Sequence, residues 1–133
     1  MHKIVFHIDD DDDDLMFFSE ALNAMPHLQV SQFRSFHEAV TAIAHGGRPD
    51  VIVMDFWVPG MAATHFLQQV SQHLDLTEVP IMVLSGTEVP LFFRELLDKY
   101  RVRYLTKPHD PAVFASMLFS NFSDGEASRH EMA

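Results

Sequence analysis

The chain has 133 residues, a common size for one domain, and 47% of them are hydrophobic, which is enough for a proper core. Its formal net charge of −10 disfavours direct binding to nucleic acid or to an anionic membrane surface. No apolar run approaches the roughly 20 residues that span a bilayer, no secretory leader opens the sequence, and cysteine is absent, so we expect a cytoplasmic protein without disulfides.

Short apolar runs alternate with segments of helical periodicity from one end of the chain to the other. In chain order the predicted elements are a strand at 3–8, a helix at 15–25, a strand at 28–33, a helix at 35–47, a strand at 50–55, a helix at 62–74, a strand at 79–85, a helix at 90–100, a strand at 102–106 and a helix at 110–122. Strict alternation of this kind predicts a parallel sheet that is covered by helices on both faces.

Several helix starts carry recognisable signals. Ser35 and Glu38 have the spacing of a capping box, and Asp110 followed by Pro111 has the pattern of a cap and a first helical position. For the first helix, the sequence offers Asp13 or Asp14 as the capping residue.

These elements predict an α/β fold of the flavodoxin-like (βα)5 type, a doubly wound parallel sheet of five strands in the order 2-1-3-4-5. The chain shows no internal repeat, linker or second domain. We expect one domain over residues 1–122 and a polar, disordered tail over residues 123–133.

Polar residues follow the predicted strands at the points where the strands end. They are Asp9 and Asp10 after the first strand, Asp55 after the third, Ser85 after the fourth and Lys107 after the fifth. Because ligands of such sheets bind beyond the carboxyl ends of the strands, we expect these side chains to converge there.

The chemistry of this set has one natural use. Three carboxylates repel one another, and a hard divalent cation such as Mg²⁺ relieves that repulsion through oxygen ligands. A lysine and a serine hydroxyl suit the oxygens of a phosphoryl group, and a carboxylate can act as a nucleophile toward phosphorus. The residues therefore indicate Mg²⁺-assisted phosphoryl transfer onto an aspartate.

With these residues in these positions, the sequence resembles the receiver domain of two-component response regulators, of the stand-alone single-domain type. The resemblance covers about residues 3–122. The matching motifs are "IDDDDDD", "VMDFWVPGM", "IMVLSG" and "YLTKP", in the family's order and on the matching elements.

The resemblance implies a phosphoacceptor, Asp55, and a Mg²⁺ site. Asp10 matches a direct ligand of the cation, Asp9 a ligand acting largely through water, and the backbone carbonyl of Trp57 a further protein ligand beside Asp55 itself.

The resemblance also implies a switch. Ser85 and Lys107 match the residues that bind the phosphoryl group, and Ser85 and Tyr104 match the pair that moves on phosphorylation. Trp57 and Thr87 flank the acceptor and are predicted to tune dephosphorylation, with the indole screening the acyl phosphate from water. Trp57 as a simple rim aromatic is the alternative.

The remaining residues receive plainer interpretations. Asp11, Asp12, Asp13 and Asp14 are interpreted as loop and helix-start residues whose charge the helix dipole tolerates. His7 is interpreted as a core or crevice-side histidine. On the fourth helix, most of the apolar side chains are interpreted as core, and the alternative is that two or three of them form an exposed dimer or partner face; the set is Phe92, Phe93, Leu96 and Leu97.

The implied partners are a sensor histidine kinase or a histidine phosphotransfer protein, an unidentified downstream protein, and a second copy bound through the fourth helix, fifth strand and fifth helix. The implied chemistry is limited to self-phosphorylation and self-dephosphorylation, so the chain is not expected to be a metabolic enzyme.

One alternative function is that of a small Mg²⁺-dependent phosphohydrolase of the haloacid dehalogenase type with Asp9 as nucleophile. Another is a pseudo-receiver that serves as a scaffold.

Overall fold

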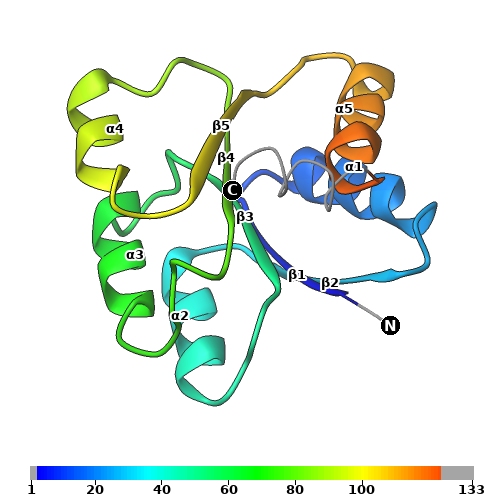
Figure 1. Ribbon diagram of the computed structural model, residues 1–133. Helices are drawn as coiled ribbons and strands as arrows, with labels where there is room; N and C mark the ends of the chain where they lie inside the picture. Colours follow the sequence, from blue (N-terminus) through cyan, green and yellow to red (C-terminus); the bar gives the residue numbers. More distant parts are fainter. Residues whose placement is uncertain (1–2, 124–133) are drawn as a thin grey trace.

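The computed structural model describes residues 3–123, which form one parallel sheet between two layers of helices (Figure 1). The strands are β1 (Lys3–Ile8), β2 (Leu28–Phe33), β3 (Val51–Asp55), β4 (Ile81–Ser85) and β5 (Val102–Thr106). The helices are α1 (Asp12–Asn23), α2 (Phe36–Ala44), α3 (Ala63–Val70), α4 (Leu91–Leu97) and α5 (Pro111–Ser123).

The strand order is β2-β1-β3-β4-β5, and every neighbouring pair is parallel, which confirms the predicted flavodoxin-like sheet. After β1, the chain forms β2 at one edge of the sheet and then returns to the other side of β1 as β3. The carboxyl ends of β1 and β3 therefore lie side by side at the point where the winding reverses, and a ligand crevice forms at such a point.

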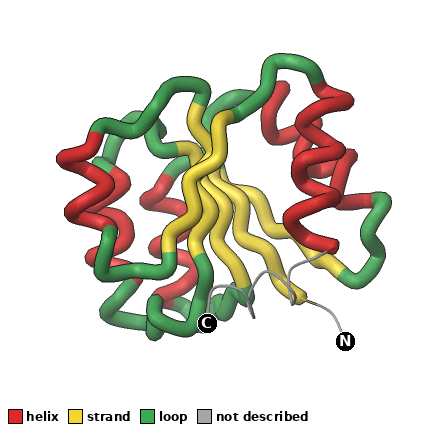
Figure 2. Tube along the Cα trace, turned by 45° about the horizontal axis from the view of Figure 1, so that its top comes forward, coloured by secondary structure: helices red, strands yellow, loops and turns green. Residues whose placement is uncertain are grey.

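The sheet separates two hydrophobic clusters. Helices α2, α3 and α4 cover one face, and α1 and α5 cover the other, as the tube in Figure 2 shows. The first cluster includes Phe36 and Phe66, whose rings stack with centroids 4.6 Å apart. The second is built around Phe18 and Leu118. Because both faces are covered, β4 is buried along its whole length, as its apolar sequence predicts.

The helix starts agree with the sequence at two places and differ at a third. The Ser35 side chain accepts the Glu38 N–H, and the Asp110 carboxylate accepts the Ala112 N–H, as predicted. The cap of α1 is Asp11, whose carboxylate accepts the N–H groups of Asp13 and Asp14. The prediction of Asp13 or Asp14 as the cap was wrong, and α1 begins three residues earlier than expected.

The helices α3 and α4 are shorter than their sequence patterns suggested, because they end at Val70 and Leu97. The helix α5 continues through Ser123, and residues 124–133 of the predicted tail lie outside the described residues. Within residues 3–123, no helix is both long and apolar enough to cross a membrane.

Candidate functional site

The ammonium group of Lys107 lies at the centre of the crevice and contacts three carboxylates. Its Nζ is 2.9 Å from Asp9 Oδ2, 3.0 Å from Asp55 Oδ2 and 2.7 Å from Asp14 Oδ2. Asp9 follows β1, Asp55 ends β3, Lys107 follows β5 and Asp14 stands in the first turn of α1. The structure therefore brings three of the predicted residues together and adds a fourth.

The backbone fixes the direction of the two carboxylates at the strand ends. Asp9 Oδ1 accepts the Asp11 N–H at 3.0 Å, and Asp55 Oδ1 accepts the Trp57 N–H at 2.9 Å. Each carboxylate thus gives one oxygen to the loop that follows it and turns the other toward Lys107. The site is consequently preorganised by loops that begin directly after the strands.

Ser85 completes the set at the end of β4. Its side chain is buried, and its Oγ accepts the Thr87 N–H at 3.3 Å. Its carbonyl accepts the backbone N–H of Lys107 at 2.7 Å, so the two residues predicted to bind a phosphoryl group are joined through the backbone.

Burial and charge act against each other at this site. Burial raises the pKa of Asp9, and the hydrogen bonds from Lys107 and the Asp11 N–H offset part of that effect. Burial also opposes the charge of Lys107, but hydrogen bonds to Asp14 and Asp9 and the charges of Asp9 and Asp55 outweigh it, and the pKa of Lys107 is raised. Lys107 is therefore a permanent cation under physiological conditions.

His7 is a core residue, as the sequence analysis interpreted it. Its ring is buried and stacks on Phe18 with centroids 3.8 Å apart, while Gln32 Nε2 lies 3.1 Å from its Nδ1. Burial, together with the charge of Lys107, lowers the pKa of His7 to about 3. His7 is therefore neutral at physiological pH and adds no charge to the neighbouring acidic crevice.

Asp10 lies apart from this cluster. It is exposed, and none of the hydrogen bonds between the described residues joins it to Asp9, Asp55 or Lys107. Within residues 3–123, no three histidine or acidic side chains are arranged as a ready-made metal site. The donors nevertheless suit a hard divalent cation, because one ammonium offsets only one of the three carboxylates that touch it.

A cavity of about 390 Å³ opens beside this cluster. Its lining includes Asp14, Asp55, Gly86, Lys107 and His109. The cavity gives a small anion a route to Asp55, whose side chain is 16% exposed while that of Asp9 is 1% exposed.

Asp14 is the site residue that the sequence analysis missed. It was interpreted as a helix-start residue, yet its contact with Lys107 is the shortest of the three. The error follows from the misplaced cap. With Asp11 as the cap, Asp14 falls in the first turn of α1, directly over the crevice, instead of in the loop.

Trp57 lies at the rim and turns toward α4. Its indole is half exposed and meets the ring of Phe93 edge to face, with centroids 6.0 Å apart. It lines an apolar hollow of about 250 Å³ together with Pro59, Met61 and Phe93. The indole is not among the residues that line the cavity beside Asp55.

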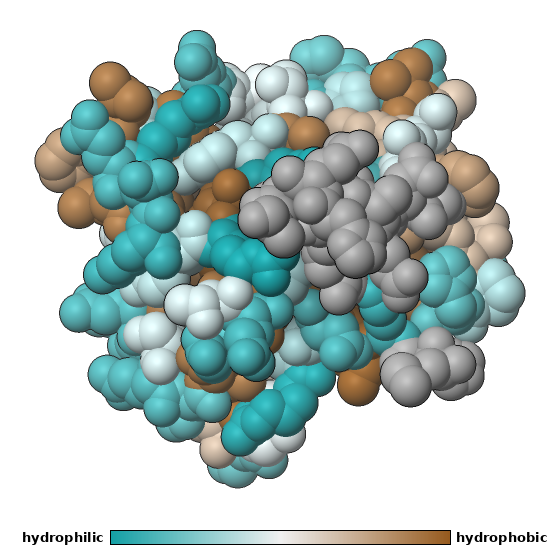
Figure 3. Space-filling model, in the orientation of Figure 1, coloured by the Kyte–Doolittle hydropathy of each residue, from teal (hydrophilic) through white to brown (hydrophobic). Residues whose placement is uncertain are grey.

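The surface of α4 carries several exposed apolar side chains. Of the four side chains in the predicted set, Phe92 and Leu96 are exposed and Leu97 is buried, so the interpretation as mostly core was wrong and the alternative of an exposed face is confirmed. Leu91, outside that set, is exposed as well. Apolar side chains gather over α4 at the upper left of Figure 3.

Tyr104, the predicted switch residue, is held by α4. The guanidinium of Arg94 lies 4.7 Å from the centroid of its ring, and the Arg94 Nε donates to the Val89 carbonyl at 3.1 Å. Burial raises the pKa of Tyr104, and the charge of Arg94 offsets part of that effect. The arginine thus connects Tyr104 with the loop that follows Ser85.

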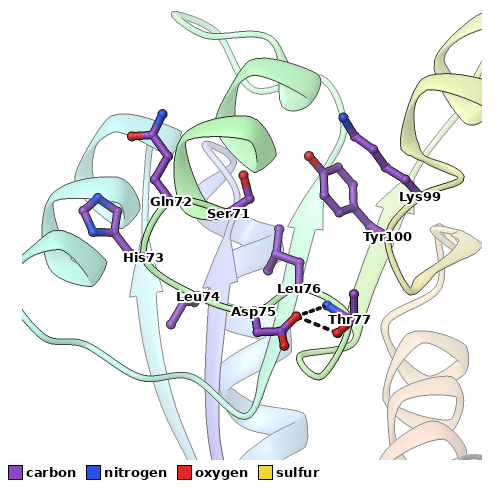
Figure 4. Close-up of a pocket in the computed structure, with 9 residues that line it drawn as sticks. All are labelled: Ser71, Gln72, His73, Leu74, Asp75, Leu76, Thr77, Lys99 and Tyr100. Carbon is purple, nitrogen blue, oxygen red and sulfur yellow. Dashed lines mark hydrogen bonds between the residues drawn. The ribbon is translucent and has the colours of Figure 1, made fainter.

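A second hollow, of about 510 Å³, lies at the amino ends of β4 and β5, where α3 leads to β4 and α4 leads to β5 (Figure 4). It is therefore at the opposite end of the strands from Lys107. Asp75 and Thr77 are hydrogen-bonded to each other there, and Lys99 lies over the ring of Tyr100. Tyr100 packs against the core from this hollow. The hollow contains none of the predicted site residues.

Comparison with known proteins finds one family model that matches most of the described residues. The family model of the response regulator receiver domain matches residues 5–119. The chain is 27% identical over 110 residues to the two-component response regulator ORR6 of Oryza sativa subsp. japonica. This alignment covers 81% of the chain and 64% of ORR6. It is 31% identical over 103 residues to the two-component response regulator ORR11 of Oryza sativa subsp. indica. This alignment covers 70% of the chain and 66% of ORR11. The matches thus span slightly less than two thirds of these relatives.

Solved structures show the same fold. The phosphorylated cyanobacterial phytochrome response regulator RcpA superposes with a TM-score of 0.76 at 22% identity, over 93% of this chain and 94% of that one. The Mn²⁺-bound form of the response regulator Rcp1 superposes with a TM-score of 0.75 at 21% identity, over 91% and 92%. These comparisons give no support to the phosphohydrolase alternative.

Proposed function

This chain belongs to the response regulator receiver domain family of two-component signalling, and from that premise we propose that Asp55 is its phosphoacceptor. The observation that supports the assignment most directly is the 3.0 Å contact between Asp55 Oδ2 and the ammonium of Lys107, beside the buried Asp9. Of the two strand-end carboxylates that touch Lys107, only Asp55 lines the cavity and can be reached by a donor.

The proposed donor is a phosphohistidine on a sensor histidine kinase or a histidine phosphotransfer protein. A carboxylate oxygen of Asp55 attacks phosphorus, the bond between phosphorus and the imidazole nitrogen breaks, and the imidazole leaves with a proton taken from solvent. The product is an acyl phosphate on Asp55. Lys107 and the Ser85 hydroxyl receive the oxygens that the transferred group brings into the crevice. This chemistry acts on the protein itself, and no other substrate is proposed.

A bound divalent cation would neutralise charge on the phosphoryl oxygens and so relieve their repulsion from the acidic crevice. Asp9, Asp10, Asp55 and the backbone carbonyl of Trp57 are the oxygen donors proposed to hold it, and Mg²⁺ is the cation that such donors suit. Asp10 lies at the exposed end of this set, from which its side chain can turn toward a cation.

We propose Ser85 and Tyr104 as the switch and the surface of α4, β5 and α5 as its readout. Tyr104 is half-buried under Arg94, so a movement of Ser85 reaches it through the loop that contains Val89. The exposed side chains of Leu91, Phe92 and Leu96 suit a protein partner on this surface, whether a downstream protein or a second copy of the chain.

Mass spectrometry after incubation with Mg²⁺ and acetyl phosphate tests the assignment. We expect one phosphoryl group on Asp55 and none without a divalent cation. Label on Asp9, or turnover of phosphate esters, would favour a hydrolase, and absence of label on a folded, Mg²⁺-saturated protein would favour a scaffold.

Trp57 and Thr87 are proposed to set the lifetime of the acyl phosphate, because their backbone N–H groups bind Asp55 and Ser85 and their side chains are exposed. We expect Trp57→Asn to shorten that lifetime several-fold by admitting water, as followed by loss of the label after removal of the phosphodonor. An unchanged lifetime would restrict the indole to its contact with Phe93.

A further inference from the structure

Every hydrogen-bond donor of the Lys107 side chain is already engaged. A lysine ammonium has three N–H groups and no acceptor, and Lys107 Nζ lies within hydrogen-bond distance of three carboxylate oxygens. A phosphoryl group on Asp55 brings new oxygens to the same ammonium. Phosphorylation removes the charge of the Asp55 carboxylate, so Lys107 can bind one of these oxygens in place of Asp55, but it has to release a further partner before it can bind a second.

The three partners are not equally easy to release. The side chain of Asp9 is 1% exposed and is held on its other oxygen by the Asp11 N–H, so its release would leave a buried charge without a cation. Asp55 is the residue that carries the new group. Asp14 is 25% exposed and lines the cavity from α1, so water can solvate its carboxylate once the contact with Lys107 is broken.

We propose that Asp14 occupies, in the unphosphorylated protein, a donor of Lys107 that a second phosphoryl oxygen takes on phosphorylation, and that it thereby stabilises the resting state against phosphorylation. This inference rests on the proposed function of Asp55. Asp14 acts on the site through Lys107, so it is a positioning residue and not a catalytic one.

The charge of Asp14 adds to the competition after its release. Asp14 and Asp55 line the same cavity, so the displaced carboxylate faces a phosphoryl group of the same sign. Like charges at this range oppose each other in a partly buried site. Removing the charge of Asp14 therefore favours the phosphorylated form through two effects. It frees an N–H donor of Lys107, and it removes the repulsion between Asp14 and the phosphoryl group.

The first variant is Asp14→Asn, with Asp14→Ala as a second that removes the acceptor oxygen altogether. The matched control is Asp13→Asn, which changes net charge equally, lies in the same first turn of α1 and lines the same cavity without a contact to Lys107. Beryllofluoride with Mg²⁺ serves as the probe of the phosphoryl position, and its bound fraction is measured by ¹⁹F NMR.

We expect both Asp14 variants to bind beryllofluoride about threefold to tenfold more tightly than the control, the range set by one charge-assisted hydrogen bond in a half-exposed site. In EDTA we expect the opposite sign, with a lower urea midpoint for the Asp14 variants than for the control, because the resting contact is lost. Tighter beryllofluoride binding together with a lower urea midpoint in EDTA is the result expected if Asp14 competes with the phosphoryl group for Lys107.

Three results would overturn the proposal. Weaker beryllofluoride binding in the Asp14 variants would make Asp14 a helper of Lys107, and equal binding in the control would leave only a general charge effect. A loss of Mg²⁺ affinity larger than that of the control, measured by titration without beryllofluoride, would make Asp14 a cation ligand. If the wild-type chain takes no label on Asp55, the proposed function fails instead, and the urea comparison in EDTA still reports on the resting contact.

Discussion

An Asp55→Asn variant is expected to take up no detectable phosphoryl group from acetyl phosphate, while the wild-type chain is labelled under the same conditions. The amide has no anionic oxygen to attack phosphorus, so the nucleophile is lost. The geometry of the loop is retained, because the amide oxygen can still accept the Trp57 N–H that now binds Asp55 Oδ1. Intact-protein mass spectrometry measures the labelled fraction.

Asp13→Asn is the control for this variant, since it removes a carboxylate from the same cavity and leaves the contacts of Lys107 in place. We expect its labelling to stay near that of the wild type. Persistent label in Asp55→Asn, mapped to Asp9 or Asp14, would show that another carboxylate is the acceptor.

A Lys107→Met variant is expected to lose about 3–5 kcal/mol of unfolding free energy at pH 7 in EDTA, the usual cost of removing one partner from a buried ion pair. The methionine keeps much of the volume of the lysine stem, so the loss reports the missing charge. Asp9 and Asp55, with side chains 1% and 16% exposed, are then left without a cation. Urea unfolding followed by circular dichroism gives the value.

The pH dependence of this loss has a definite sign. The pKa of Asp9 is already raised in the folded protein, so the native state binds more protons than the unfolded chain in the window above the ordinary value near 4. Without Lys107 this pKa rises further. The deficit of Lys107→Met should therefore be largest at neutral pH and shrink as the pH falls through the raised pKa of Asp9.

A divalent cation should also reduce the deficit, because it binds the folded crevice and not the unfolded chain. Lys99→Met is the control, since Lys99 is exposed and lies over the ring of Tyr100, and its replacement should cost well under 1 kcal/mol. Equal losses in the two variants would mean that the contacts of Lys107 contribute nothing specific to stability.

The sheet could be predicted because its signals are local and repeated. Each central strand is a short apolar run, each connection contains a helical pattern, and the handedness of the crossovers leaves few ways to order five parallel strands. Helix limits were less accurate. A run of six aspartates offers several equivalent caps, and the structure selects Asp11 because its carboxylate reaches two N–H groups of the first turn.

The candidate site could be predicted only as far as strand ends determine it. Asp55 and Ser85 end their strands, and Asp9 and Lys107 follow theirs directly, so the strand order alone brings the four residues together. Asp14 stands on a helix, and its approach to Lys107 depends on how α1 is started and tilted, which no local pattern encodes.

The contact between Lys107 and Asp9 joins residues that are 98 positions apart in the chain. Such a contact has a high contact order, and its loop-closure entropy has to be overcome late, when the last strand docks against its neighbour. A nascent chain that has left the ribosome as far as β4 already carries the clustered aspartates but has no ammonium to set against them. On the proposed function, efficient phosphorylation of Asp55 should therefore require the chain through Lys107, because a chain that stops at β4 has no ammonium beside this carboxylate.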